Sequence, residues 1–323
     1  MPGPATAPMP HPPFPSTVLE FQERFGTEKA ARNYLTLCRW PGGFQCPSCR
    51  APGGYPRSDR LATECSACGR ITSLTSGTVL ANSKTPLRGW LWAAWLMVTS
   101  KRGLSASELA RQIGVTVETA FMMLHKLRAA MVAPDRQLLR GRVEVDESYI
   151  GGPKAGARGR GAAGKSLVVG AVEVREHAPG RIRLRCIPRA DSLHLHKFVR
   201  ESVEEGATVV TDGLPAYEGL YGYRHVRVIQ GQGQDPDEVL GCFHMAISNM
   251  KAWLKGTHHG RVEARHLQAY LEEFSFRFNR RGNLGAAFQR LLGLSSQVGT
   301  VTYDAIYEAG RAPGAKRRRG SRG

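Results

Sequence analysis

Four cysteines near the N-terminus constrain the fold of this chain more than any other feature. They form two CxxC pairs, Cys46 with Cys49 and Cys65 with Cys68, and fifteen residues separate the pairs. Each pair places two thiolates on one turn, and the intervening segment brings the second pair round to complete a tetrahedral site. Because four sulfurs leave no open coordination position, we expect a structural zinc ion that supplies folding energy to this segment. Two disulfides, or four unrelated cysteines, are the alternatives.

The other three cysteines fit neither pair. Cys38 lies outside the two pairs, and Cys186 and Cys242 read as ordinary core cysteines. An odd total of seven, with four in close pairs, favours metal binding in a reducing compartment over a disulfide framework.

The charge of the chain is strongly positive. Its 45 Lys and Arg against 27 Asp and Glu give a net charge of +18. Basic side chains placed on phosphates release condensed counterions, so this excess predicts a nucleic acid as the partner, and the helix pair described below makes it double-stranded DNA. A soluble enzyme with a charged shell is the alternative. The apolar run from Trp90 to Val98 is too short for a bilayer, and the proline-rich start lacks the features of a signal peptide. We therefore expect no membrane association and a cytoplasmic protein.

The segment between about 85 and 131 has a helical pattern. Thr85 as the N-cap and Pro86 as the first helical residue suit the start of a Trp-rich helix that ends near Gly103. The sequence Ser105-Ala-Ser-Glu108 has the form of a capping box, and a short helix to Ile113 stops at Gly114. Thr116 caps a second helix that runs to about Met131. This pair predicts a helix-turn-helix, although many structural helix pairs share the pattern.

In a helix-turn-helix, the second helix enters the major groove of DNA. We expect its N-terminal residues to face the bases and its later basic residues to lie along the phosphate backbone. The first group is Thr116, Glu118 and Thr119, and the second is Lys126 and Arg128.

Beyond Arg140 the hydrophobic period changes to two. Along 142–150, Val143 and Val145 face one way while Glu144 and Asp146 face the other. Strands over 167–174 and 181–187, a helix over 193–204 and a strand over 208–211 follow. Three hairpin-like strands, a helix and another strand are typical of an RNase H-like mixed α/β sheet.

Two aspartates on this expected sheet point to catalysis. Asp146 lies at the centre of a strand, where a carboxylate is costly without a cation or hydrogen-bond donors, and Asp212 follows a buried strand. Carboxylates on adjacent strand ends can bridge two Mg²⁺ or Mn²⁺ ions. Such an ion pair can activate an attacking hydroxyl and stabilise the leaving oxygen in phosphoryl transfer. Either aspartate could instead merely cap a turn.

Several segments together resemble a known family. They are RWPGGFQCPSC at 39–49, VEVDESYIGG at 143–152, TDG at 211–213, GTHHG at 256–260, and HLQAYL at 266–271 leading to FRFNRR at 276–281. The chain resembles bacterial insertion-sequence transposases of the Merlin-like superfamily, in the ISXO-like branch with an N-terminal zinc ribbon. The resemblance covers residues 18 to about 292. It implies an RNase H-like DDE-type fold, two divalent ions, and joining of transposon ends to target DNA.

The third acidic position of that pattern is replaced here. The superfamily has glutamate on a helix with a basic residue seven positions later, just before a Gly-Thr turn. Counting back from Gly256 places His244 at the glutamate position and Lys251 at the basic one. Asn249 is the alternative, because it can offer a carbonyl oxygen. A packed helix histidine and a disabled copy also stay open. Lys255 shares the face of His244 and Lys251.

The expected organisation has five parts. They are a disordered tail (1–16), a helical lead-in with the zinc ribbon (17–82), the helix-turn-helix (83–135), the RNase H-like domain (136–295) and a basic tail (296–323). We expect the lead-in to bury Leu19, Phe21 and Phe25, among others. Arg277, Arg280 and Arg281 are candidates for a DNA channel, or form a solvated helix end. Because two transposon ends must be held together, we expect a homodimer or a higher assembly on DNA.

Two other functions stay open at this point. One is a zinc-ribbon DNA-binding regulator whose α/β half only dimerises or binds a partner, which requires Asp146 and Asp212 to be far apart or hydrogen-bonded internally. The other is a metal-dependent nuclease that cleaves DNA without joining it to a target.

Overall fold

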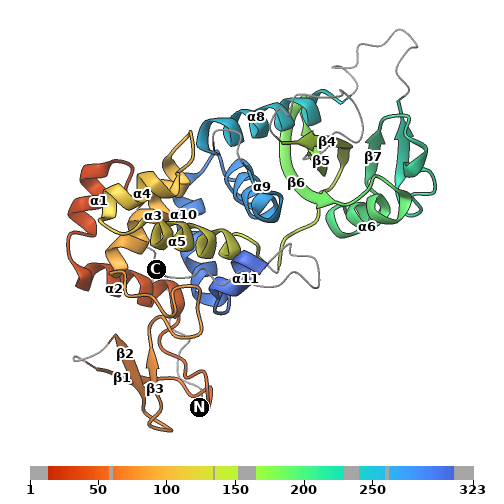
Figure 1. Cartoon of the computed structure of the whole chain (residues 1–323). Coiled ribbons are helices and arrows are strands. Elements are labelled where there is room, and N and C mark those ends of the chain that lie inside the picture. The colour runs from red at the N-terminus through yellow and green to blue at the C-terminus, as the bar shows by residue number, and fades with distance from the viewer. Residues whose placement is uncertain are drawn as a thin grey trace.

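The computed structural model describes residues 14–57, 61–133, 135–151, 165–228, 240–258 and 262–308. Along the chain these residues form a small β-sheet, a helical body and a larger sheet with helices on both faces (Figure 1). Most of the Gly- and Arg-rich loop at 154–165, the dipeptide His259-Gly260 and the basic run 316–319 lie outside the described residues.

The cysteine-rich segment forms a three-stranded antiparallel sheet. Its strands are β1 (Gly54–Arg57), β2 (Ala62–Cys65) and β3 (Ile71–Ser73), in the order β1-β2-β3. Arg39 attaches this sheet to the helical body: its guanidinium donates to the carbonyl oxygens of Ser73, Leu74 and Ser76. A segment with so few apolar side chains is therefore held by hydrogen bonds at one end and by its cysteines at the other.

The helical body is built from both halves of the chain. It contains α1 (Val18–Arg24), α2 (Glu28–Arg39), α3 (Leu87–Thr99), α4 (Ala106–Ile113), α5 (Val117–Ala130) and α10 (Leu284–Gln297). Phe288, Leu291 and Leu292 of α10 lie in the same apolar cluster as Trp90 and Leu91 of α3. The expected boundary at residue 295 placed α10 with the catalytic sheet, but its apolar face packs on the N-terminal helices.

The lead-in differs in detail from the expectation. It is two helices, because Thr27 caps α2 by accepting a hydrogen bond from the N–H of Ala30. Phe21 and Phe25 are buried as expected, but Leu19 is 76% exposed. Residues 14–16 are packed and not part of a disordered tail: the ring of Phe14 contacts Phe288, and the indole of Trp95 donates to the carbonyl oxygen of Pro15.

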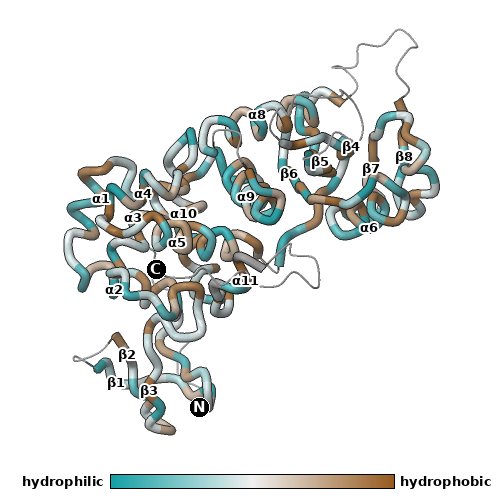
Figure 2. The backbone as a smooth tube through the Cα atoms, viewed as in Figure 1, coloured by the Kyte–Doolittle hydropathy of each residue, from teal (hydrophilic) through white to brown (hydrophobic). Residues whose placement is uncertain are grey.

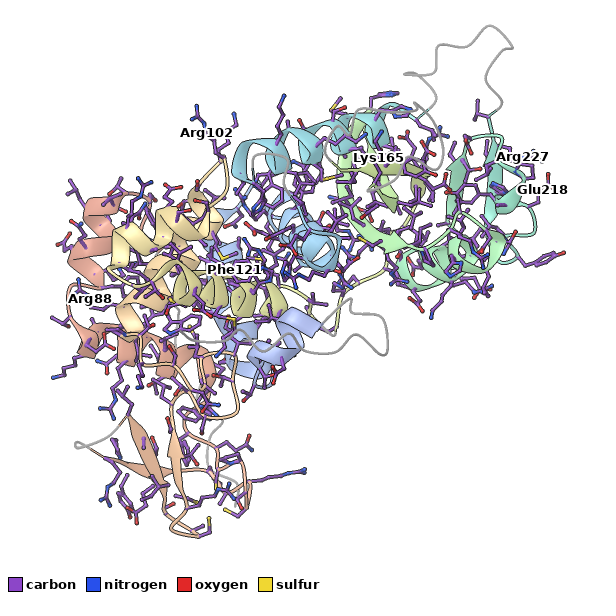
Figure 3. The ribbon with its side chains drawn as sticks, in the orientation of Figure 1. Arg88, Arg102, Phe121, Lys165, Glu218 and Arg227 are labelled. Carbon is purple, nitrogen blue, oxygen red and sulfur yellow. The ribbon has the colours of Figure 1, made fainter. Side chains whose placement is uncertain are left out.

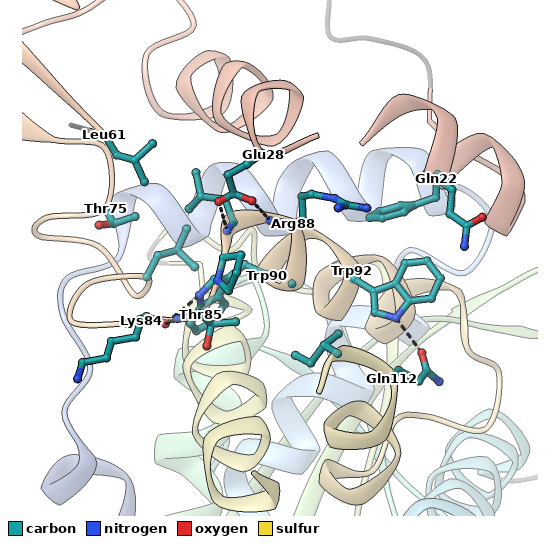
Figure 4. Close-up of a pocket in the computed structure, with 17 residues that line it drawn as sticks. Gln22, Glu28, Leu61, Thr75, Lys84, Thr85, Arg88, Trp90, Trp92 and Gln112 are labelled. Carbon is teal, nitrogen blue, oxygen red and sulfur yellow. Dashed lines mark hydrogen bonds between the residues drawn. The ribbon is translucent and has the colours of Figure 1, made fainter. Parts of the chain in front are cut away.

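The N-terminus of α3 is capped by a residue from another helix. The helix begins at Leu87 with Pro86 as its N-cap, and no side chain of the cap residue itself closes the turn. Instead, the carboxylate of Glu28 accepts hydrogen bonds from the N–H groups of Leu87 (2.5 Å) and Arg88 (3.2 Å), as Figure 4 shows. The expected Thr85 cap is therefore wrong, because a negative charge from α2 satisfies these helix N–H groups.

The helix-turn-helix elements form as predicted. Ser105 caps α4 by accepting from the N–H of Glu108, and Gly114 ends the helix in the left-handed conformation with φ +69°. Thr116 caps α5 by accepting from the N–H of Thr119. The side-chain caps and the glycine stop were readable in the sequence because each acts within a few residues.

The larger sheet is mixed and has five strands. They are β4 (Arg142–Ile150), β5 (Ser166–Arg175), β6 (Ala178–Ile187), β7 (Thr208–Thr211) and β8 (Arg224–Arg227), in the order β6-β5-β4-β7-β8. The first three pair antiparallel, whereas β4 pairs parallel with β7 and β7 with β8. This arrangement confirms the predicted RNase H-like α/β fold. The apolar β7 appears brown in Figure 2.

Helices cover both faces of this sheet. On one face, α6 (Ser192–Ser202) and the 3₁₀ turn η1 (Pro215–Tyr217) pack over Val143, Val145 and Val209. On the other face lie α8 (Gly241–His258) and α9 (Ala264–Phe278), packed over Val168, Val172 and Ile182. A short helix, α11 (Tyr303–Glu308), follows α10, so the expected C-terminal tail contains regular structure. Within the described ranges, no helix is both long and apolar enough to cross a membrane.

A buried ion network joins the helical body to the sheet domain. The guanidinium of Arg128 on α5 bonds the carboxylate of Glu273 on α9 at 2.7 Å, and their side chains are 2% and 0% exposed. Arg277, also on α9, lies 3.6 Å from Glu273 and donates to the carbonyl oxygen of Ser100, at the end of α3. The turn between α3 and α4 is thus held against the sheet domain.

Candidate active site

The four paired cysteines converge in space. The Sγ atoms of Cys46 and Cys68 are 3.7 Å apart, those of Cys49 and Cys65 are 3.6 Å apart, and all four lie within 4.8 Å of one another. Four sulfurs bound to one zinc at about 2.3 Å stand roughly 3.8 Å apart, so this cluster has the size of a tetrahedral zinc site.

The backbone around the cysteines favours thiolates. The N–H groups of Cys49 and Ser48 lower the pKa of Cys46 to about 6, and those of Cys68 and Ala67 lower the pKa of Cys65. The N–H of Ala51 acts in the same direction on Cys49, but without a metal the other cysteine side chains raise the pKa of Cys49 to about 12. Thiolate is the form that binds zinc. Cys38 is buried away from the cluster in the helical core, and burial raises its pKa to about 12. The donor set and its spacing therefore fit a structural zinc ion.

Asp146 and Asp212 stand on neighbouring parallel strands. In the ladder between β4 and β7, Arg142 pairs with Thr208, Val143 with Val209 and Glu144 with Val210. Every pair differs by 66 positions, which is also the separation of Asp146 and Asp212. The two aspartates therefore occupy matching levels, two residues past the last pair of the ladder, with Asp212 directly after the end of β7.

The strand alternation places Asp146 on the face covered by α8. Val143 and Val145 are buried on the α6 face, and Glu144 points the other way, where its carboxylate accepts from the N–H of Phe243 at 2.8 Å. Asp146 has the same parity as Glu144. Its Oδ1 accepts from the N–H of Glu147, and Oδ1 of Asp212 accepts from the N–H of Leu214, so backbone donors orient both carboxylates.

Two lysines contribute positive charge to this region. Lys251 on α8 is exposed, and partial desolvation by its surroundings lowers its pKa; the charge of Lys165 also lowers the pKa, and the charge of Asp146 raises it. The structure therefore brings Lys251 and Lys165 within electrostatic reach of each other, and Lys251 within reach of Asp146. Lys165, which directly precedes β5, is labelled in Figure 3. Lys251 was among the predicted site residues, whereas Lys165 was not.

Tyr217 is a further residue near both aspartates. Its side chain is fully buried, and burial raises its pKa well above the usual value, with further contributions from the charges of Glu147, Asp146 and Asp212. The phenol belongs to the apolar cluster on the α6 side of the sheet, within electrostatic reach of both aspartates. The segment TDGLPAY contains it, but nothing in the sequence distinguishes it from an ordinary core tyrosine.

The first turn of α8 carries His244. Its charge lowers the pKa of the buried Glu144, while burial, the largest effect, raises that pKa. His244 and Glu144 line a cavity of about 920 Å³ with Arg142 and Ser248. His244 therefore lies beside Glu144, about 10 Å along the helix from Lys251 at 1.5 Å per residue. Asn249 is exposed and lies only two residues before Lys251.

The predicted DNA-contacting residues of α5 divide into two groups. Thr116, the N-cap, and Glu118 are exposed at the start of the helix, and Thr119 is half-buried there. Lys126 and Arg128 are buried instead, 8% and 2% exposed. Lys126 donates to the carbonyl oxygen of Ala81, and Arg128 bonds Glu273. The expectation that these two side chains lie along the DNA backbone is corrected, because both hold the helical body together.

The basic residues of the later helices are also mostly engaged. Arg277 is buried against Ser100 and Glu273. Arg280 lies over the ring of Phe276, and Arg281 donates to the carbonyl oxygens of Pro179 and Gly180. Lys255, one turn beyond Lys251, is exposed. Of this group, Lys255 is the side chain that the structure leaves on the surface of α8.

Comparisons with known proteins agree with this architecture. Residues 138–279 match the family model of the ISXO2-like transposase domain, and residues 26–70 match that of the transposase zinc-ribbon domain. A protein of Halobacterium salinarum, described as an uncharacterized protein in transposable element ISH50, is 29% identical over 278 residues. The aligned region covers 78% of this chain and 91% of that relative.

Two solved structures show more distant similarity. The simian T-cell lymphotropic virus intasome in complex with PP2A regulatory subunit B56 gamma aligns with a TM-score of 0.28 and 14% identity, over 56% of this chain and 66% of that chain, just under two thirds of its length. The Mos1 transposase paired-end complex with left transposon end aligns with a TM-score of 0.23 and 10% identity, over 61% and 78%.

Proposed function

We propose that this chain, which carries a transposase zinc ribbon and an ISXO2-like transposase domain, is a DNA transposase that cleaves at the ends of its element and joins the freed 3′-hydroxyl to target DNA. The observation that carries the proposal is the shared register of Asp146 and Asp212 on adjacent parallel strands. It brings two carboxylates to one end of a strand pair inside the matched domain. An aspartate that merely capped a turn would not need a second aspartate at the same level of the neighbouring strand.

The donor set fits divalent ions with a preference for oxygen ligands. Asp146 and Asp212 would hold Mg²⁺ or Mn²⁺, because these hard cations bind carboxylate oxygens. When bound, two such ions activate the attacking hydroxyl and stabilise the leaving oxygen. The backbone donors at Glu147 and Leu214 keep the two carboxylates in place.

The side chains of α8 supply the remaining groups of the proposed site. Lys251, whose pKa responds to the charge of Asp146, would contact a DNA phosphate beside the carboxylates. His244 and Asn249 are both retained as candidates for the third site residue. His244 shares the face of Lys251 and can transfer a proton, whereas Asn249 lies closer to Lys251 along the helix and can offer a carbonyl oxygen.

DNA recognition is assigned to the N-terminal parts. The zinc ribbon and the first turn of α5, with Thr116, Glu118 and Thr119, would contact the terminal repeats, and Lys255 would lie along the bound DNA. The excess of basic residues supports DNA as the partner. We assign the chain to a bacterial element of the Merlin-like superfamily, acting in the cytoplasm as a homodimer or higher assembly.

A joining assay tests this function. The full-length zinc-loaded protein is incubated in Mg²⁺ with duplexes carrying the element's ends and with a supercoiled target. Asp146→Asn and Asp212→Asn should each lower joining by at least about a thousandfold, the effect of losing about 4 kcal/mol of transition-state stabilisation. Glu201→Gln is the matched control, because Glu201 pairs with Arg185 on β6, the edge strand on the other side of the sheet from β7.

The same assay separates the alternatives. Cleavage without joining by the wild-type protein would indicate a nuclease, and binding without cleavage would indicate a regulator. Ala substitution at His244 and at Asn249 identifies the third residue, since only the one that serves the site should match the loss seen for the aspartates.

A further inference from the structure

A second polar cavity lies away from the aspartates, at the junction of the two halves of the protein. It has a volume of about 400 Å³ and is enclosed by the linker between α5 and β4, the edge strand β6, α9 and α10. Five arginines line it, Arg136, Arg181, Arg183, Arg280 and Arg290. We call this cavity the arginine pocket. Because β6 is two strands from β4 in the sheet, the pocket is separate from the Asp146–Asp212 site.

The carboxylates around the arginine pocket do not balance its positive charge. Of the described carboxylates, Asp135 and Glu272 line it, and they pair with Arg290 (2.6 Å) and Arg136 (2.7 Å). Arg181 is directed to Glu173 on β5. Arg183 and Arg280 donate to backbone carbonyl oxygens, those of Ile182 and Gln137 for Arg183 and that of Phe276 for Arg280. Among the described residues, neither of these two guanidiniums forms an ion pair.

Burial and the crowding of like charges both act on Arg183. Burial, followed by the nearby charges of Arg136 and Arg181, lowers its pKa to about 10, although the charge of Glu272 acts in the opposite direction. Holding several guanidiniums together costs free energy unless an anion offsets their repulsion.

A buried hydroxyl in the pocket also lacks a partner. Ser275 on α9 lines the cavity, is 4% exposed, and its Oγ has no hydrogen-bond partner among the described residues. A buried hydroxyl without a partner is costly. The Ser275 hydroxyl can donate a hydrogen bond to an oxygen atom bound in the cavity. This contribution does not depend on the charges of the arginines.

We propose that the arginine pocket binds a phosphate group, through the guanidiniums of Arg183 and Arg280 and the hydroxyl of Ser275. Guanidinium groups match the geometry of phosphate oxygens, and the hydroxyl supplies an additional donor. The phosphate belongs either to the backbone of bound DNA, which rests on the proposed function, or to a free phosphate ion, which does not.

Calorimetric titration with inorganic phosphate tests the chemistry directly. The full-length zinc-loaded protein is titrated against a chloride control at equal ionic strength. Arg183→Gln and Arg280→Gln should each weaken phosphate binding at least about tenfold, and Ser275→Ala about fivefold, the equivalent of one hydrogen bond. Arg189→Gln is the matched control, because the Arg189 side chain is 80% exposed. Circular dichroism and zinc content verify that each variant is folded.

A second arm identifies the source of the phosphate. Binding of a duplex is measured across salt concentrations, and each contacted phosphate contributes roughly one unit to the slope of log K against log salt. A slope reduced in Arg183→Gln and Arg280→Gln but not in Arg189→Gln assigns the pocket to DNA. Phosphate binding with unchanged slopes assigns it to a free ion. The proposal is overturned if wild-type protein binds phosphate no better than chloride and the slopes are unchanged. If the protein binds phosphate but joins no DNA strands, the proposed function fails and the phosphate-binding proposal holds.

Discussion

Asp146 on β4 and Asp212 after β7 stand at matching levels of two parallel strands, each two residues beyond the Glu144–Val210 pair. The constant offset of 66 positions in this ladder explains how two aspartates far apart in the sequence meet. A shift of one residue in the register would move them to different levels and send their side chains to different faces. The proposed chemistry therefore depends on the pairing of β4 with β7.

Removing a cysteine should remove zinc from the ribbon. We expect about one zinc per chain in the wild-type protein and less than about a tenth of that in Cys49→Ser, because three sulfurs no longer close the site. The zinc content of purified protein is measured by atomic emission. Cys186→Ser is the control, since Cys186 lies on β6. Full zinc in Cys49→Ser would contradict the assignment.

Loss of the Glu28 carboxylate should destabilise the helical body. Glu28→Ala leaves the N–H groups of Leu87 and Arg88 without their acceptor, at a cost of about 1–2 kcal/mol in the free energy of unfolding. Urea denaturation measures the change, and Glu23→Ala on the exposed side of α1 is the control. Equal stability of the two variants would show that Glu28 does not cap α3.

Substitutions of Glu273 and of Arg128, which belong to the buried network at the domain junction, should lower the free energy of unfolding by different amounts. Glu273→Gln leaves both Arg128 and Arg277 without a carboxylate and should cost about 3–5 kcal/mol. Arg128→Met should cost less, because Glu273 keeps Arg277 as a partner. Urea denaturation of both variants measures the difference, and a larger loss in Arg128→Met would refute this order.

Acid should destabilise the protein through His125. Burial, followed by the charge of Arg128, lowers its pKa to about 2, and the neighbouring His266 also has a lowered pKa. The unfolded chain takes up a proton near pH 6.5, but the folded protein does not, so stability is present above that pH and is lost as the pH falls. Between pH 7.5 and 5.5, His125 alone should account for about 1.4 kcal/mol.

The variant His125→Phe isolates this contribution. Phenylalanine can take the ring position beside Phe121, and the pH-dependent loss should shrink by about 1.4 kcal/mol. Urea midpoints at the two pH values measure it. An unchanged pH dependence would mean that His125 does not set the acid sensitivity.

The features that act over short sequence distances were predictable. The cysteine pairs, the Ser105 and Thr116 caps and the Gly114 stop each depend on residues within a few positions, and all were found where expected. The strand alternation around Asp146 likewise follows from the period of two.

Features that depend on distant partners were not predictable. Lys126 and Arg128 resemble surface residues of a DNA-reading helix, yet they are buried because Ala81 and Glu273 accept their hydrogen bonds. Glu28 caps a helix that begins 59 residues later, and α10 packs on helices from the other end of the chain. At the candidate site, Tyr217 and Lys165 gain their significance only from the fold, which brings them to the aspartates and Lys251.

The most direct test of the central claim is Mn²⁺ binding to the full-length protein, followed by electron paramagnetic resonance. If Asp146 and Asp212 share a metal site, Asp146→Asn and Asp212→Asn should each weaken Mn²⁺ binding by about tenfold or more, and Glu201→Gln should bind like the wild type. Wild-type Mn²⁺ affinity in Asp212→Asn would contradict the account, because the two carboxylates would then not hold ions together.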